Sequence, residues 1–406
     1  MQASRYTFVS TVLIFLLLPS AFFAQTITGV WQTAASQGFS SRYSITSSVV
    51  NGRIYVFGGI KGNDILNTLE VYDPGTNKWS TPTTTGTFTP RYGLTSSVVN
   101  NKIYVIGGYD DSCLATVEMF DPSSNTWSTP VTTGTFTPRA HLTSNVVNGK
   151  IYVIGGVQYD SNQNTIYLNS IEVFDPQTNI WSTPVTTGKL GARATHSSAV
   201  VGGKIYVMGG DGPGGHHVDV FDPVMNTCDS IATMLHWRSD ATANVLSNKI
   251  FFMGGYNGND VNLVDCFDPG TNSWSTPQTT GTFTAREGLA SSVVGNSLYA
   301  MGGLSDALGF LNTNEVLNLN TATAAETSRS DIAIFPNPSS GIIAVTGLPE
   351  NIIKIDVINM LGQTVLELSN TYSSTATLDL SNKPAGLYFA KFITTNSTQV
   401  KKIIRR

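Results

Sequence analysis

The chain has 406 residues, of which 12% are charged, and its formal net charge is −4. This length accommodates one large domain and one small domain. The chain carries no basic block before its last few residues, which argues against a nucleic-acid partner. Glycine, threonine and serine are plentiful, a composition typical of short strands joined by polar turns, so we predict an all-β protein.

The N-terminus reads as a secretory signal peptide over residues 1–24. Arg5 precedes the nearly continuous apolar run from Val9 to Leu18, which is too short to span a bilayer comfortably. Small residues follow, and we predict cleavage after Ala24. An uncleaved anchor is the alternative interpretation.

A Gly-Gly pair recurs six times, each time after a short apolar run such as IYVFGG at residues 54–59. The pairs end at residues 59, 108, 156, 210, 255 and 303, so the period is 45 to 54 residues. This period fits a propeller blade. The apolar runs do not alternate with polar residues, which predicts strands buried on both faces between stacked blades.

Each repeat contains further shared features in a constant order. A turn such as Asn51-Gly52 precedes the apolar run, and an acidic residue, two apolar residues and Asp-Pro follow it, as in EVYDP at residues 70–74. A tryptophan comes next at Trp79, Trp127, Trp181 and Trp274. Unit four has Cys228 instead, where Trp237 is a candidate to fill the gap. An arginine begins the following unit, and the six are Arg42, Arg91, Arg139, Arg193, Arg238 and Arg286.

This pattern over residues 29 to 320 resembles the kelch repeat, and the resemblance implies a six-bladed β-propeller. Unit six has an acidic strand at Glu315 but no tryptophan after it, whereas Trp31 precedes the first unit. We therefore expect the segment around residues 29–33 to supply the outer strand of the last blade and close the ring. The predicted propeller domain covers residues 25–320.

The C-terminal part has a different pattern. Residues 321–330 are small and polar and read as a linker, and residues 331–406 contain short alternating strands typical of a small Ig-like β-sandwich. The spaced motifs FPNPSSG, DVINMLGQ, LDLSNKPAGLYFAKF and KKIIRR resemble the C-terminal sorting domain of the Bacteroidetes type IX secretion system. The resemblance implies that residues 331–406 engage that machinery and that the protein is secreted or held at the cell surface. An ordinary sandwich module of the mature protein is the alternative.

The six arginines are the candidate binding residues, because strand parity places them near the face that carries the variable loops. One interpretation is a ring of guanidinium groups that binds an anionic or polyhydroxylated ligand such as a glycan. The other, which repetition in every unit favours, is that each arginine pairs with an acidic residue and holds its blade together.

No catalytic or metal-binding pattern stands out in the sequence. His216 and His217 are adjacent, and neighbouring side chains of a strand point to opposite faces, so we expect no metal and no cofactor. The three cysteines do not suggest a disulfide framework. Sialic-acid mutarotases share the generic repeat, and Glu287 beside Arg286 is a possible acid/base residue.

The near-identical connectors between units favour a scaffold or binding protein over an enzyme, because a catalytic site needs distinct residues from different blades. We therefore expect an exported propeller that binds a glycan, a polymer or a protein at or outside the cell surface. A sugar-modifying enzyme of the mutarotase type is the alternative.

Overall fold

The computed structural model describes residues 27–320, 332–348, 352–360, 362–369, 375–394 and 398–406. The predicted signal peptide at 1–24 and linker at 321–330 lie outside these residues. The chain divides into two compact units, Met1–Ala322 and Thr323–Arg406. The regular elements of the described residues are β-strands, and these residues contain no helix long and apolar enough to cross a membrane.

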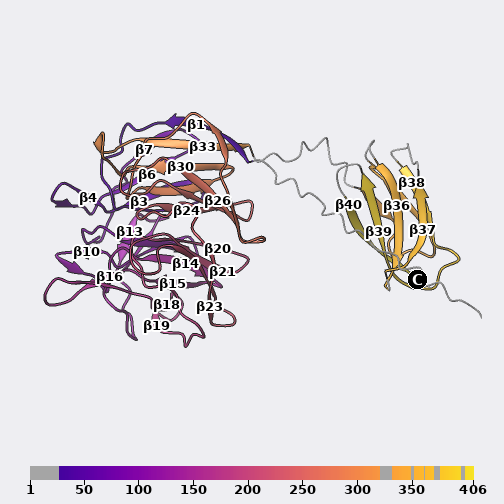
Figure 1. Cartoon of the computed structure of the whole chain (residues 1–406), viewed down its shortest axis with the longest axis horizontal. Coiled ribbons are helices and arrows are strands. Elements are labelled where there is room, and N and C mark those ends of the chain that lie inside the picture. Colours follow the sequence, from indigo (N-terminus) through magenta and orange to yellow (C-terminus); the bar gives the residue numbers. More distant parts are fainter. Residues whose placement is uncertain (1–26, 321–331, 349–351, 361, 370–374, 395–397) are drawn as a thin grey trace, which may run out of the picture. The chain divides into compact units, whose positions relative to one another are not determined.

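The described residues of the first unit contain six sheets of four or five strands, one for each sequence repeat (Figure 1). Blade 1 consists of β2 (Thr46–Val50), β3 (Arg53–Phe57), β6 (Leu69–Asp73) and β7 (Lys78–Ser80). Blade 2 consists of β8 (Thr95–Val99), β9 (Lys102–Ile106), β12 (Val117–Asp121) and β13 (Thr126–Ser128). Blade 3 consists of β14 (Thr143–Val147), β15 (Lys150–Ile154), β18 (Ile171–Asp175) and β19 (Ile180–Ser182).

The remaining blades repeat this order. Blade 4 consists of β20 (Ser197–Val201), β21 (Lys204–Met208), β22 (His217–Asp222) and β23 (Thr227–Thr233). Blade 5 consists of β24 (Thr242–Leu246), β25 (Lys249–Met253), β26 (Val264–Asp268) and β27 (Ser273–Ser275). Blade 6 consists of β29 (Ala290–Val294), β30 (Ser297–Met301), β33 (Asn314–Asn320) and β1 (Thr28–Ala34), with β28 (Gln278–Thr280) added beside β1. The kelch-type repeat is therefore a β-propeller.

Short hairpins join the second and third strands of four blades. They are β4 (Ile60–Lys61) with β5 (Asp64–Ile65), β10 (Tyr109–Asp110) with β11 (Ser112–Cys113), β16 (Val157–Tyr159) with β17 (Thr165–Tyr167), and β31 (Leu304–Ser305) with β32 (Gly309–Phe310).

The second strand of each blade forms the core, as its uninterrupted apolar sequence predicts. Ile54 and Val56 of β3, and the equivalent residues of the other blades, are fully buried because neighbouring blades cover both faces of the sheet. The turn before this strand requires residues that tolerate positive φ, and Asn51 and Gly52 adopt 50° and 75° there. Hydrophobic packing between neighbouring blades therefore stabilises the propeller.

Residues from the two ends of the propeller sequence share the sixth blade. β1 pairs with β33 in an antiparallel register that sets Trp31 opposite Leu317, and Figure 1 shows the two strands side by side. Trp31 is buried and lies 4.6 Å from Phe283, centroid to centroid. The first and last parts of the propeller sequence are therefore held in one sheet.

Most tryptophans of the outer strands are stacked on a phenylalanine from the preceding connector. The ring centroids of Phe88 and Trp127 are 4.4 Å apart, and those of Phe136 and Trp181 are 4.2 Å apart. Blade 4 replaces this pair with Leu190 and Cys228, which pack together in one cluster. Trp237 does not fill that gap, so this expectation was wrong: it stacks on His216 instead, and its indole N–H donates to the Gly210 carbonyl.

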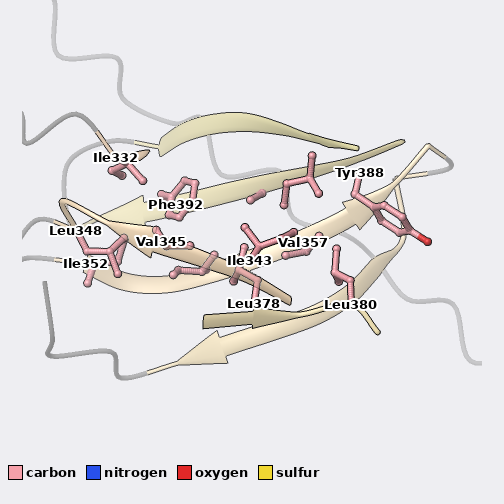
Figure 2. Close-up of a cluster of buried hydrophobic side chains, with 13 residues drawn as sticks. Ile332, Ile343, Val345, Leu348, Ile352, Val357, Leu378, Leu380, Tyr388 and Phe392 are labelled. Carbon is pink, nitrogen blue, oxygen red and sulfur yellow. The ribbon is translucent and has the colours of Figure 1, made fainter. Parts of the chain in front are cut away.

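The second unit is a sandwich of two sheets. One sheet contains β34 (Ala333–Phe335), β35 (Ile342–Thr346) and β38 (Thr375–Asp379). The other contains β36 (Ile352–Asn359), β37 (Thr364–Ser369), β39 (Gly386–Thr394) and β40 (Thr398–Arg405). Ile343 and Leu378 from the first sheet meet Val357 and Phe392 from the second in one buried cluster, so the unit has a core of its own (Figure 2).

Candidate functional site

The six repeat arginines lie inside the blades. Their exposed fractions are 0–1%, and each pairs with the acidic residue near the start of the third strand of its own blade. The distances are 2.7 Å for Arg91–Glu118, 2.8 Å for Arg139–Glu172 and 2.6 Å for Arg238–Asp265. Arg42, Arg193 and Arg286 pair in the same way with Glu70, Asp219 and Glu315.

The arginines also explain why the Gly-Gly pair recurs. Each guanidinium donates to the carbonyl of the first glycine of its own blade, as Arg91 does to Gly107 at 3.1 Å. The second glycine donates its N–H to the carbonyl of the next blade's arginine, as Gly59 does to Arg91 at 2.9 Å. The same bond from Gly303 to Arg42 joins the last blade to the first. The arginines therefore hold each blade and connect it to its neighbour.

A closed belt of backbone hydrogen bonds surrounds the central channel. It is formed by the residue two positions after each arginine, and all six residues have φ between 50° and 58°. Each N–H donates to the carbonyl of the equivalent residue in the preceding blade, over distances of 2.7–3.1 Å. The six residues of this belt are Ser44, Gly93, His141, Thr195, Asp240 and Gly288.

The channel inside the belt is a hollow of about 220 Å³. Its wall is largely hydroxyl groups from the innermost strands, which bond to each other between blades. Ser48 and Ser96 lie 2.8 Å apart, and Ser97 and Ser144 also lie 2.8 Å apart. His141 and Asp240 of the belt also line this polar space. A hollow with a few convergent polar groups is typical of a ligand site.

We call the end of the channel next to the belt its mouth, and tyrosines of blades 2 and 3 gather beside it, with Tyr92 directly before Gly93 of the belt. Tyr92 is 5.5 Å from Tyr109 and 5.9 Å from His141, centroid to centroid, and Tyr109 is 5.7 Å from Tyr159. Burial is the main cause that raises the pKa of Tyr92 to about 12, and burial lowers the pKa of His141 to about 4. These side chains are therefore neutral at pH 7. We call Tyr92, Tyr109, Tyr159 and His141 the tyrosine sector.

Carboxylates gather on the other side of the mouth, contributed by blades 4, 5 and 6. Burial, together with the charges of Asp260, Asp306 and Asp211, raises the pKa of Glu287 to about 7. Burial and the charge of Glu287 raise the pKa of Asp240 well above its usual value. We call Asp211, Asp240, Asp260, Glu287 and Asp306 the acidic sector. The two sectors make the mouth asymmetric, although the blades repeat.

Replacing Glu287 with glutamine is expected to change the pH dependence of stability. The folded protein holds the Glu287 proton more tightly than the unfolded chain, because the pKa rises from 4.5 to about 7. Wild-type stability therefore falls as pH rises between these values. After allowance for solvent screening, Glu287→Gln should exceed the wild type by about 1–2 kcal/mol at pH 8 and match it near pH 4. Denaturant unfolding at pH 4, 6 and 8 measures this, and a difference that is independent of pH contradicts it.

The mouth differs in two ways from the site that the arginines suggest. The guanidinium groups are fully buried, and the side chains that are only partly buried belong to one of the two residues after each arginine. These partly buried residues are Tyr43, Tyr92, His141, Thr195, Asp240 and Glu287. Variation directly after an invariant residue is the sequence signal that could have located the mouth.

The adjacent histidines and the cysteines are the other polar candidates of the sequence. His216 stacks on Trp237 at 5.0 Å, and the described residues contain no group of three His, Cys, Asp or Glu side chains suited to a metal ion. The three cysteines are free.

Comparison with protein families agrees with this architecture. Residues 18–156 and 87–236 match the KLHDC2/KLHL20/DRC7 Kelch-repeats domain, and residues 238–279 match the Kelch motif. The chain is a kelch-repeat protein. Residues 333–406 of this kelch protein match the secretion system C-terminal sorting domain. The sorting domain indicates export, with a location at the cell surface or outside the cell.

Curated relatives share the repeats over part of their length. The kelch protein is 28% identical over 203 residues to Acyl-CoA-binding domain-containing protein 4 of Arabidopsis thaliana, covering 45% of this chain and 28% of the relative. It is 29% identical over 142 residues to Kelch-like protein 23 of Pongo abelii (34% and 25%) and 28% identical over 152 residues to Kelch domain-containing protein 3 of Bos taurus (32% and 40%). The chain thus spans between a quarter and two fifths of these relatives.

Proposed function

We propose that this exported kelch protein binds a neutral or positively charged ligand, such as a glycan, a polymer or a protein segment, at the channel mouth. The observation that carries the proposal is the asymmetry of the mouth around a hollow. Tyrosine rings supply flat apolar faces that suit sugar rings or aliphatic cations, and the carboxylates accept hydrogen bonds from hydroxyl or amino groups. Because Arg286 is buried against Glu315, it is not free to bind an anionic ligand.

A glycan array that includes neutral, amino and acidic sugars, probed with residues 25–325, tests this proposal. We expect binding to neutral or amino sugars and weaker binding to sialylated ones, because the acidic sector repels carboxylates. Tyr92→Ala should weaken the binding of a retained glycan about five-fold, and Glu287→Gln about ten-fold.

Val185→Ser is the matched control, because Val185 is 93% exposed in a connector next to an outer strand. Its affinity should equal that of the wild type. Equal affinity of the wild type, Tyr92→Ala and Glu287→Gln would place the ligand elsewhere on the propeller.

A sugar-modifying enzyme of the mutarotase type is a second candidate, and one observation favours it. The pKa of Glu287, raised to about 7, suits a residue that exchanges a proton near neutral pH. NMR of anomer interconversion of galactose and sialic acid separates the candidates. Exchange that is catalysed by the wild type and lost in Glu287→Gln would promote the enzyme. Glycan binding without faster exchange supports the binding protein.

A further inference from the structure

The outer strands of the blades are covered by the connector that arrives from the preceding blade. In blades 2, 3 and 4, a threonine of this connector pairs in parallel with the outer strand. The Thr85 N–H donates to the Asn125 carbonyl at 3.0 Å, and the Trp127 N–H donates to the Thr85 carbonyl at 2.8 Å. In blade 6, β28 pairs in parallel with β1. The connector therefore satisfies backbone groups that would otherwise form a sheet edge.

The covering segments share a side-chain pattern as well as a register. The residue three positions after the paired threonine packs on the tryptophan or its replacement: Phe88 on Trp127, Phe136 on Trp181, and Leu190 on Cys228. In blade 1, where the connector is one residue shorter, the described residues show no parallel backbone pair with β7 either, but the Ala35 N–H donates to the Asn77 side chain at 2.8 Å and Phe39 stacks on Trp79 at 4.2 Å.

In blade 5 the described residues of the connector make no such parallel backbone pair with the outer strand. Arg238 follows Cys228 by ten positions, whereas Arg139 follows Trp127 by twelve. The first part of the shorter connector belongs to β23, where Ala232 and Thr233 pair with Val218 and His217 of blade 4. These residues cannot also pair with β27.

The edge of β27 is consequently open. Trp274 stands opposite Phe267 in the register that Trp127 has opposite Phe120, so its N–H points away from the sheet. Within the described part of the chain, no backbone–backbone bond joins a connector to the main-chain N–H of Trp274 or to the Asn272 carbonyl, although the indole N–H of Trp274 donates to the Thr233 carbonyl at 2.9 Å. Trp274 is also only partly buried, and Leu235, three residues before the arginine, is 45% exposed.

We propose that β27 binds an extended, uncharged segment of a partner protein, which adds to blade 5 as a parallel strand. The partner residue would occupy the place that Thr133 occupies in blade 3, accepting a bond from the Trp274 N–H and donating one to the Asn272 carbonyl. An aromatic residue three positions later would pack on Trp274. Strand addition to an open edge is an established mode of peptide recognition, and the chain's own connectors specify the occupant.

Hydrogen–deuterium exchange with the probe peptide Val-Thr-Thr-Gly-Thr-Phe, the sequence of residues 131–136, tests the proposal. Without peptide, the Trp274 amide should exchange at least ten-fold faster than the amides of Trp127 and Trp181, because these are bonded to Thr85 and Thr133. Saturating peptide should slow the Trp274 amide and leave the other two unchanged.

Peptide controls require no change in the protein. Proline at the second threonine removes the donor to Asn272 and should abolish binding. Alanine in place of phenylalanine should weaken binding about five-fold.

The matched protein control is a refilled variant, in which a connector of full length covers the edge of β27. Replacing residues 229–237 with the sequence of residues 128–138 restores the twelve-residue spacing. This variant should protect the Trp274 amide without peptide and should no longer bind peptide, and Trp274→Ala should also bind less peptide. Wild-type protection equal to that of Trp127, or no slowing of the Trp274 amide by the peptide, would overturn the proposal. Peptide binding that survives in the refilled variant would also overturn it.

Discussion

Removal of Thr28–Ala34 is expected to lower the melting temperature of the propeller by about 10 °C or more. The deletion exposes the edge of β33, which pairs with β1 over seven residues, and removes the buried Trp31 from Phe283, Leu298 and Leu317. Loss of a buried tryptophan alone costs about 3–5 kcal/mol, and β28 also loses its partner. Differential scanning calorimetry of the propeller with and without these residues measures the effect.

Point variants separate the loss of the tryptophan from the loss of the strand. Trp31→Ala should cost about 3–5 kcal/mol, whereas Trp274→Ala should cost less, because Trp274 is only partly buried and lies on the open edge of blade 5. An unchanged melting temperature after the deletion would contradict closure of the ring by β1.

Arg91→Ala is expected to destabilise the propeller by about 3–5 kcal/mol, because it leaves the Glu118 carboxylate buried without its cation. Arg91 is fully buried, and its guanidinium also bonds to the Gly107 carbonyl and the Thr116 hydroxyl. Denaturant unfolding measures the loss.

The surface pair Arg53–Asp73 is the matched control. Its N–O distance is 3.1 Å, and the Arg53 side chain is 58% exposed. Arg53→Ala should therefore cost at most about 1 kcal/mol. Because Arg91 does not line the mouth, the folded Arg91→Ala protein should bind the mouth ligand as the wild type does. A stable Arg91→Ala protein with weakened binding would instead assign this arginine to ligand recognition.

Repetition in the sequence indicates the role of the arginines only in part. An arginine in every unit indicates a role that every blade needs, and an acidic residue at a constant position offers a partner. The sequence does not predict whether the two side chains are in contact. Their contact depends on the strand register, which places Glu118 opposite Val105 and within reach of Arg91.

The mouth could be predicted less well than the blades. Tyr92, Tyr109 and Tyr159 belong to two blades and are separated by up to 67 residues, and Asp240 and Glu287 belong to two others. Their convergence depends on the curvature of the ring, which no single repeat encodes. The open edge of blade 5 was also hard to predict. The sequence shows a connector that is two residues shorter, but it does not show that this connector pairs with β22.

The sequence by itself determined the repeated unit of this protein, because local rules act within each blade: turn residues with positive φ, an apolar strand buried on both faces, and an aromatic anchor on the outer strand. It also determined the separate sorting domain through its motifs. Only the tertiary structure decided that the arginines are internal and that tyrosines and carboxylates share the channel mouth. It likewise decided that the connector into blade 5 leaves the backbone edge of β27 unpaired. These features arise from contacts between blades, where residues distant in sequence are brought together by closure of the ring.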